Sequence, residues 1–242
     1  MSRWCAGVMT APDHVAREAQ VLPDLIGRAA VFDLDRTLLA GSSLVALARV
    51  LARNGLVSGQ QLISGLAMDQ VFRRRGASDD DAARLRTLAL RQVAGADVEQ
   101  LRALTDEVGR TLSRQVLPGA RMLLRRHHEA GDFVVILSAS PQELVEAVAS
   151  RLGAQRAVGT RAEIDGTRYT GALDGPFCYG PGKVQRLEQD LGPGSLGAAT
   201  AYADSVSDLP VLEACREPVA VNPDRALYRV AKGRGWPVVR FG

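Results

Sequence analysis

Short apolar runs separated by helical patterns constrain the fold of this chain more than any other feature. The runs are apolar throughout instead of alternating, which is typical of strands that are covered on both faces. Strand and helix in alternation predict an α/β fold with a doubly wound parallel sheet. The predicted strands are 28–34, 133–137, 198–203, 218–221 and, at an edge, 237–239. The helical patterns cover 118–130, 141–152, 182–191 and 209–215.

Residues 42–117 interrupt this rhythm with successive helices and no convincing strand. Ser78 and the three aspartates after it predict a helix start, because acidic side chains in a first turn oppose the helix dipole favourably. A later helix carries one apolar stripe, formed by Leu101, Leu104, Val108, Leu112 and Val116. We therefore predict an N-terminal extension at 1–24, an α/β core from 25–41 and 118–242, and a helical insert at 42–117.

Two smaller patterns complete the predicted organisation. Residues 160–175 form short alternating segments around an Asp165-Gly166 turn, which predicts a β-hairpin. Cys5, Cys178 and Cys215 lie far apart and form no CxxC motif, so we expect buried apolar residues in a reducing compartment.

Composition excludes several classes of protein. The 242 residues are 46% hydrophobic and 24% charged, which is unlike a disordered tail, a collagen or a disulfide scaffold. Lysine and arginine outnumber acidic residues by only 30 to 27, so no nucleic-acid-binding surface is expected. The chain has no apolar stretch of about 20 residues that would span a membrane, and no secretory signal is recognised. We expect a soluble, cytoplasmic protein without a membrane partner.

Reactive side chains follow the predicted strands. Asp33 and Asp35 leave the first apolar run two positions apart. Ser138 and Ala139 follow the second run at a helix start, where backbone amides and the helix dipole favour an anion. Ligands in such sheets bind beyond the carboxyl ends of the strands, so these groups are expected to meet in one crevice.

Two further segments add charge to the same edge. Lys183 stands at a predicted helix start, where its charge opposes the dipole and an anionic partner is suspected. Asp204 and Asp208 follow another predicted strand. Carboxylates of this kind suit Mg²⁺, and an aspartate nucleophile, an acid and a lysine are the requirements of phosphoryl transfer.

Together these residues resemble the four motifs of the haloacid dehalogenase superfamily. The motifs are Asp33-x-Asp35-x-Thr37, Ser138, Lys183 and Asp204-x-x-x-Asp208. Their order and spacing match from residue 28 to about residue 225. The helical insert resembles the C1-type cap of the phosphoserine-phosphatase-like subfamily IB. The resemblance implies a Mg²⁺-dependent phosphatase that hydrolyses a small phosphorylated metabolite through an aspartyl-phosphate.

The resemblance also implies a role for each residue. Asp33 is the expected nucleophile and metal ligand, and Asp35 is the expected general acid, with its backbone carbonyl on the metal. Asp204 is expected to ligate Mg²⁺. Asp208 is expected to belong to the same metal site by orienting the groups around the ion. Phosphate contacts are expected from Thr37, Ser138, Ala139, Lys183 and Ser207.

One departure bears on the substrate. Phosphoserine phosphatases carry a glutamate about nine residues after the nucleophile, and this chain has Ser42 there. An ammonium group buried without its carboxylate is costly, so we expect other small phosphate esters to be hydrolysed at least as well as phosphoserine. Phosphoserine remains the leading alternative.

Other readings have less support. A receiver-like signalling protein also uses an aspartate acceptor, but it usually places the acceptor on a later strand. His127 and His128 lack a third ligand and are interpreted as surface residues near a helix end, not as a zinc site. The sequence matches neither a phosphate-binding P-loop nor a dinucleotide-binding glycine motif.

Overall fold

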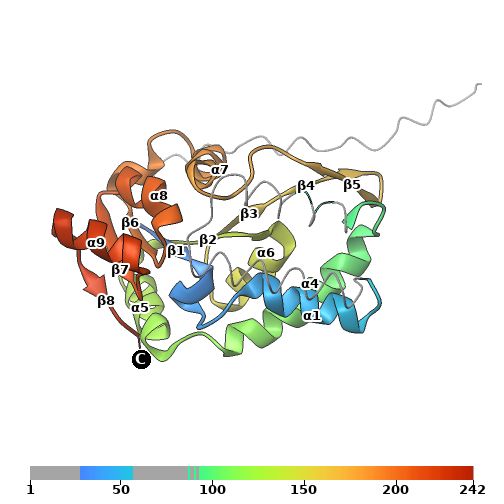
Figure 1. Cartoon of the computed structure of the whole chain (residues 1–242), viewed down its shortest axis with the longest axis horizontal. Coiled ribbons are helices and arrows are strands. Elements are labelled where there is room, and N and C mark those ends of the chain that lie inside the picture. Colours follow the sequence, from blue (N-terminus) through green and yellow to red (C-terminus); the bar gives the residue numbers. More distant parts are fainter. Residues whose placement is uncertain (1–27, 57–86, 88–89, 91–92, 242) are drawn as a thin grey trace, which may run out of the picture.

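The computed structural model describes residues 28–56, 87, 90 and 93–241. A six-stranded parallel sheet runs through the middle of the fold, in the order β3-β2-β1-β6-β7-β8 (Figure 1). The strands are β1 (Ala29–Asp33), β2 (Phe133–Pro141), β3 (Arg156–Thr160), β6 (Thr200–Ala203), β7 (Glu217–Val221) and β8 (Val238–Val239). The strand that ends in Asp33 therefore lies between two parallel neighbours inside the sheet, and the predicted α/β class is confirmed.

Helices cover both faces of this sheet. Side chains of α5 (Pro118–Glu129) and α6 (Gln142–Arg151) pack with Ala30 and Phe32 of β1 on one face. The opposite face packs Val31 against α7 (Pro181–Leu191), α8 (Leu209–Ala214) and α9 (Arg225–Arg234). Because successive side chains of a strand point to opposite faces, a strand buried on both faces is apolar at every position. That explains the uninterrupted apolar run.

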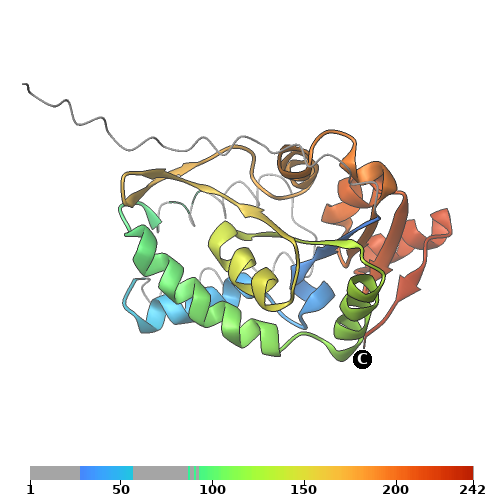
Figure 2. The same cartoon turned by 180° about the vertical axis from the view of Figure 1, so that it is seen from behind.

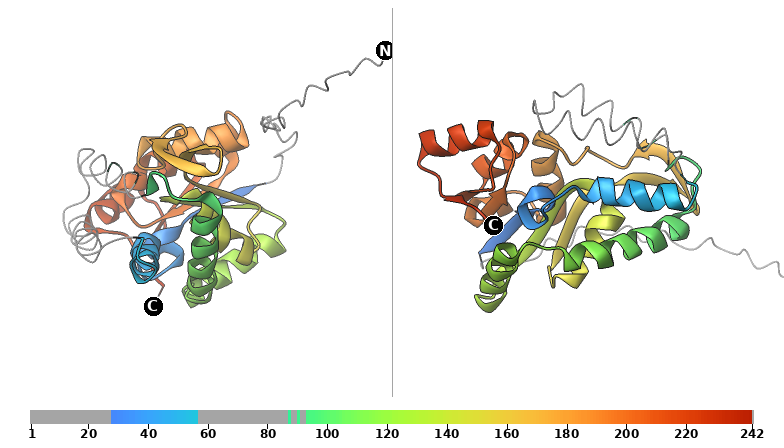
Figure 3. Two further views of the ribbon diagram at one scale, coloured as in Figure 1. Left: turned by 90° about the vertical axis from the view of Figure 1, so that its right-hand side faces the viewer. Right: turned by 60° about the horizontal axis from the view of Figure 1, so that its bottom comes forward.

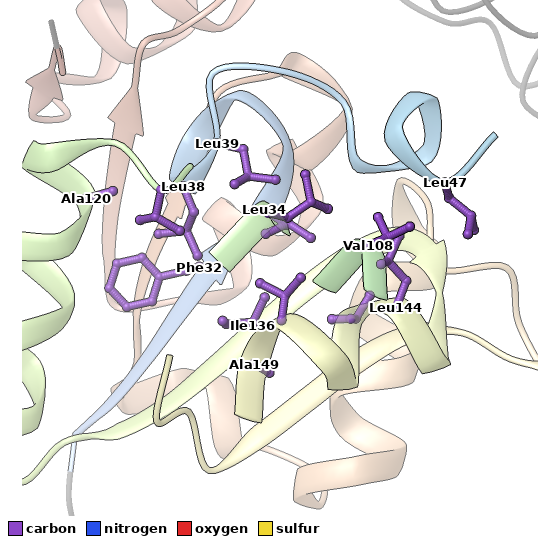
Figure 4. Close-up of a cluster of buried hydrophobic side chains, with 14 of the residues drawn as sticks. Phe32, Leu34, Leu38, Leu39, Leu47, Val108, Ala120, Ile136, Leu144 and Ala149 are labelled. Carbon is purple, nitrogen blue, oxygen red and sulfur yellow. The ribbon is translucent and has the colours of Figure 1, made fainter. Parts of the chain in front are cut away.

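Two helices of the 42–117 segment lie on the α6 side of the sheet. They are α1 (Ser43–Arg53) and α4 (Val98–Arg114), and α4 packs against both α1 and α6 (Figures 1 and 2). A side chain on Gly109 of α4 would put its Cβ 2.6 Å from the Cβ of Ala147, so this close helix contact requires glycine. Figure 4 shows Leu47, Val108 and Leu144 of the three helices meeting in one apolar cluster.

The predicted apolar stripe is correct within α4 and wrong at its end. Leu101, Val108 and Leu112 are buried, whereas Val116 lies beyond the last helical residue, Arg114. Val116 instead forms an antiparallel bridge with Leu39. The helix ends before Val116 because the chain there re-enters the α/β core and pairs with Leu39, in the segment by which it left the core.

The predicted hairpin is confirmed as β4 (Ala162–Asp165) paired with β5 (Arg168–Leu173). It lies next to the start of α4 at one end of the molecule, far from α9 (Figure 3). Tyr169 anchors it: its backbone exchanges hydrogen bonds with Gly95 and Ala96, and its hydroxyl donates to Glu143 of α6 over 2.8 Å. Burial raises the pKa of Tyr169, so this hydroxyl stays protonated.

Several elements and residues differ from expectation or lie outside the described part. Strand β3 and helix α9 were not predicted, and short helical turns also occur at Ser195–Ala198 and Val206–Asp208. Cys178 and Cys215 are buried free thiols, as predicted. Residues 1–24, Cys5 included, and the predicted helix start at Ser78 lie outside the described residues. Among the described helices, none has the length and apolar character that crossing a membrane requires.

Candidate active site

The acidic pair of β1 lies in an unusual turn. Asp33 is the last residue of β1, and a single wide helical turn follows over Leu34–Leu38. Within this turn Asp35 is extended, with φ −76° and ψ 128°, and Arg36 adopts a left-handed conformation with φ 61°. Residues other than glycine rarely adopt positive φ, and such strain clusters at functional sites.

Lys183 joins two of the predicted site carboxylates. Its Nζ donates to Oδ1 of Asp33 and to Oδ1 of Asp208, each over 2.6 Å, and its side chain is only 5% exposed. Gly182, in the first turn of α7, allows the helix to start close to the preceding loop, because a Cβ there would collide with the carbonyl oxygen of Phe177. Lys183 thus lies in the first turn of a helix whose dipole it opposes, as predicted, and two anions offset that cost.

Asp204 completes an acidic cluster. It follows β6 directly, and its carboxylate has an oxygen within 4.8 Å of oxygens from both Asp33 and Asp208. Its backbone carbonyl accepts a 2.7 Å hydrogen bond from the backbone N–H of Asp224, and Nε of Arg36 lies 2.8 Å from its Oδ2. We call Asp33, Lys183, Asp204 and Asp208 the acidic cluster.

Burial dominates the electrostatics of this cluster. It raises the pKa of Asp33 to about 7, against the opposing effect of Lys183. Burial and the neighbouring Asp33 also raise the pKa of Asp204 well above its usual range, although Arg36 counteracts this. Burial would lower the pKa of Lys183, but Asp208 and Asp33 raise it well above its usual value, so the lysine is charged. Three buried carboxylates beside one lysine therefore favour binding of further positive charge.

Asp35 is held by the start of α1. The backbone N–H of Ser43 donates to Oδ1 of Asp35 over 2.8 Å. Burial raises the pKa of Asp35, while hydrogen bonds from Ser43 oppose the rise. A raised carboxyl pKa favours the protonated form that a general acid needs.

Ser43 also connects α1 to the end of β2. Its Oγ lies 2.7 Å from Oγ of Ser140, and both residues are buried. The backbone N–H of Ser140 in turn donates to Oγ of Ser138 over 3.1 Å. Ala139 is fixed by Thr160 of β3, whose hydroxyl donates to its carbonyl over 2.7 Å. The predicted Ser138-Ala139 segment is therefore rigidly held beside the first acidic pair.

The hydroxyl groups of Thr37, Ser207 and Ser42 differ in their hydrogen bonds. The hydroxyl of Thr37 is buried and has no hydrogen-bond partner among the described residues, so it is available to a ligand. Ser207 donates its hydroxyl to Ser205 over 3.1 Å. Ser42 caps α1, accepting from the N–H of Val45 over 3.4 Å. Its side chain thus has a structural task at the position where the family resemblance expects a glutamate.

The interpretation of His127 as a surface residue is wrong. Its side chain is 14% exposed, with Nδ1 2.7 Å from Oδ2 of Asp132 and Nε2 2.8 Å from the hydroxyl of Tyr202. His128 contacts the carbonyl of Leu152 over 3.1 Å. Helical spacing alone hides such contacts, because Tyr202 comes from a strand 75 positions away. Neither histidine belongs to the acidic cluster.

Sequence reasoning missed Arg36, Ser43 and Ser140. A charged residue between Asp35 and Thr37 is a signal for Arg36, but its left-handed backbone has no sequence signature. Ser43 follows the capping serine directly, and only the tertiary structure brings it to Ser140.

The acidic cluster suits a magnesium ion. Asp33, Asp204 and Asp208 offer hard oxygen ligands, with no nitrogen or sulfur donor in the same group. Mg²⁺ is usually held by one or two carboxylates together with substrate phosphate and water. The donor set therefore favours Mg²⁺ over softer metals.

Comparisons with known proteins identify the family of the chain. Residues 30–213 match the family described as haloacid dehalogenase-like hydrolase. The chain is 37% identical to the probable phosphatase Rv3661 of Mycobacterium tuberculosis, over 88% of this chain and 75% of that protein. It is 35% identical to the phosphoserine phosphatase SerB1 of the same species, covering 96% and 77%. It is 34% identical to a histidinol-phosphatase of Neisseria meningitidis, covering 88% and 98%.

Solved structures show the same fold. A protein of unknown function from Bordetella pertussis superposes with a TM-score of 0.76 at 29% identity, covering 88% of this chain and 98% of that one. A substrate-bound phosphoserine phosphatase superposes with a TM-score of 0.61 at 15% identity, covering 88% and 92%. With the family match spanning most of the chain and its motif residues gathered at one edge of the sheet, the chain belongs to the haloacid dehalogenase-like hydrolases.

Proposed function

We propose that this protein is a Mg²⁺-dependent phosphatase that hydrolyses small phosphate monoesters through an aspartyl-phosphate on Asp33. The observation that carries the proposal is the double contact of Lys183 with Asp33 and Asp208. It gathers a candidate nucleophile, a phosphate-neutralising cation and carboxylate ligands from three separate segments of the chain. The names of the relatives, a probable phosphatase among them, support the same class of reaction.

In the first half-reaction, an oxygen of the Asp33 carboxylate attacks phosphorus and the bond to the ester oxygen breaks. Asp35 gives its proton to that departing oxygen, which leaves as an alcohol. Lys183 neutralises charge on the phosphoryl oxygens, and the Thr37 hydroxyl and the Ser138 segment supply hydrogen bonds.

In the second half-reaction, Asp35 takes a proton from water while the water oxygen attacks phosphorus. The bond between phosphorus and Asp33 breaks, phosphate leaves, and Asp35 is again protonated for the next cycle. Asp33, Asp204, Asp208 and the backbone carbonyl of Asp35 would hold Mg²⁺, with Asp208 also receiving Lys183. When bound, that ion neutralises charge on the phosphoryl group.

The substrate is proposed to be a small phosphorylated metabolite of the cytoplasm. Phosphoserine is the second candidate, because one relative is named a phosphoserine phosphatase. Another relative is named a histidinol-phosphatase, so the names of relatives point to different esters. The capping role of Ser42 favours esters that need no carboxylate at that position.

A substrate panel tests both candidates. Purified full-length protein with Mg²⁺ is offered phosphoserine, histidinol phosphate, sugar phosphates and p-nitrophenyl phosphate. Acid quenching with radiolabelled ester should leave label on the wild type and none on Asp33→Asn. Ser42→Glu should raise kcat/KM for phosphoserine by about 30- to 150-fold relative to an uncharged-alcohol phosphate, if the new ion pair is worth about 2–3 kcal/mol. A hundredfold wild-type preference for phosphoserine would refute the inference from Ser42.

A further inference from the structure

Two basic side chains divide the three carboxylates of the acidic cluster between them. Lys183 engages Oδ1 of Asp33 and Oδ1 of Asp208. Arg36 forms an ion pair with the third, with its Nε 2.8 Å from Oδ2 of Asp204. Each carboxylate therefore has one oxygen beside a protein cation, and among the described residues the other oxygen is available to a divalent ion.

The backbone around Arg36 is built to present this side chain. Its N–H donates to the carbonyl of Gly41 and its carbonyl accepts from the Asn222 side chain, each over 3.3 Å. These two contacts hold the left-handed conformation, with φ 61°, between β1 and the end of β7. Strained conformations persist where the surroundings over-determine them. The origin of the Arg36 side chain is consequently fixed relative to the sheet.

The Asp204 side chain can still rotate about its own bonds, although its backbone is fixed. Its backbone is fixed by β6 and by the hydrogen bond from Asp224, and its carboxylate is 5% exposed. Water is therefore largely excluded from orienting this carboxylate, and rotation about the side-chain bonds is limited by Arg36.

We propose that Arg36 is a positioning residue for the divalent cation, which fixes Oδ2 of Asp204 and thereby keeps Oδ1 available as a metal ligand. The proposal rests on the proposed function only in taking Asp204 as a ligand. Groups that contact a ligating carboxylate from outside the ligand set commonly change metal affinity by about 10- to 100-fold. Charge repulsion alone would act in the opposite direction, because a neighbouring arginine disfavours a second cation. The sign of the effect therefore distinguishes positioning from repulsion.

Arg36→Asn and Arg36→Lys test this role. Asparagine is among the residues that tolerate left-handed backbone, so Arg36→Asn removes the guanidinium with little backbone penalty. Lysine keeps a charge but loses the planar, multi-donor geometry of arginine. Arg110→Asn is the matched control, because Arg110 forms an exposed ion pair with Asp106 on α4.

Cation binding is measured without substrate, by calorimetry with Mg²⁺ and by electron paramagnetic resonance with Mn²⁺. Arg36→Asn should raise both Kd values about tenfold or more, and Arg36→Lys should raise them less. Arg110→Asn should match the wild type. Saturating Mg²⁺ should restore most of the kcat of Arg36→Asn, which a merely unfolded variant would not allow. If the metal-free Arg36→Asn variant melts far below the wild type, the Kd values of Arg36→Lys are used to test the proposal instead.

Unchanged or lower Kd values in the folded Arg36 variants would overturn the positioning role and leave the phosphatase proposal intact. A wild type that binds neither cation and shows no Mg²⁺-dependent hydrolysis would overturn both. The two failures are distinguished by the wild-type titration alone.

Discussion

Two groups of polar side chains lie along strand β6, and they differ in how many of their polar groups have partners in the protein. The acidic cluster extends from Asp33 and Asp204, at or just beyond the strand ends. The second group, which we call the histidine network, consists of His127, Asp132 and Tyr202. Its Tyr202 ring stacks on Phe32, the residue before Asp33, with ring centroids 4.6 Å apart.

The side chains of the histidine network hydrogen-bond to one another. With a proton on Nδ1, His127 donates to Asp132 and accepts from the hydroxyl of Tyr202. Burial raises the pKa of Tyr202 to about 12, which keeps that hydroxyl a donor. The second oxygen of Asp132 lies 3.5 Å from Nε of Arg28. Such a network satisfies its own groups, and its value is in stability.

The acidic cluster has more negative than positive groups. Three carboxylates share one lysine and one arginine, and the buried Thr37 hydroxyl nearby has no partner among the described residues. Excess negative charge and an unpaired donor are costs that a folded protein retains where a ligand will satisfy them. The acidic cluster is therefore distinguished as a ligand site by its unpaired charge and hydrogen-bonding groups, whereas the histidine network is structural. Four experiments test this distinction.

The largest effect is expected from Asp33→Asn. An amide is a poor nucleophile and a poor cation ligand, so kcat should fall by about four orders of magnitude or more. Steady-state hydrolysis of p-nitrophenyl phosphate measures it. The isosteric control Asp132→Asn in the histidine network should leave kcat nearly unchanged. Equal losses in both variants would erase the distinction between the two groups.

Asp35→Asn should have a smaller effect that depends on the leaving group. Without a proton donor, hydrolysis of alkyl phosphates should slow by about 10²- to 10⁴-fold. Loss on p-nitrophenyl phosphate should be much less, since nitrophenolate leaves without protonation. Parallel kinetics on the two esters measure the ratio. A uniform loss on both esters would assign Asp35 to binding instead of proton transfer.

Removal of the cation should affect the acidic cluster alone. EDTA should abolish hydrolysis, and Mg²⁺ should restore it. Mg²⁺ at about a hundred times its Kd should stabilise the wild type by about 2.7 kcal/mol, seen as a higher melting temperature. Asp204→Asn should lose most of this rise, whereas Asp132→Asn should keep it. Full turnover in EDTA would contradict the metal assignment.

Tyr202→Phe should show the smallest effect, and on stability instead of activity. It leaves Nε2 of His127 without its partner, which costs about 1–3 kcal/mol in the free energy of unfolding. Urea denaturation measures this loss, and kcat should change little. A large fall in kcat with unchanged stability would mean that the histidine network serves the chemistry.

The sheet and most of the site were predictable because parallel strands place their carboxyl ends at one edge. The apolar runs located β1, β2 and β6, so Asp33, Ser138 and Asp204 were expected to meet. The role of Lys183 rested on the family resemblance, since no local pattern shows a contact across 150 positions.

The remainder depends on tertiary contacts without a local signal. Strand β3 is a short edge segment with only two adjacent apolar residues between polar ends, and helix α9 carries four basic residues among its apolar ones. The left-handed Arg36 contacts Asn222 just after β7, and the buried His127 contacts Tyr202 of β6, so both depend on partners far away in the sequence.

The central place of β1 has a consequence for folding. During synthesis this strand emerges before both of its neighbours, which begin at Phe133 and Thr200. Non-local pairing of this kind is slow, because the chain must close long loops before any contact rewards it. Until then an apolar strand that ends in a carboxylate stays unpaired and prone to aggregate. Since Asp33 and Lys183 lie 150 positions apart, their contact also requires closure of a long loop, and we expect the acidic cluster to assemble late in folding.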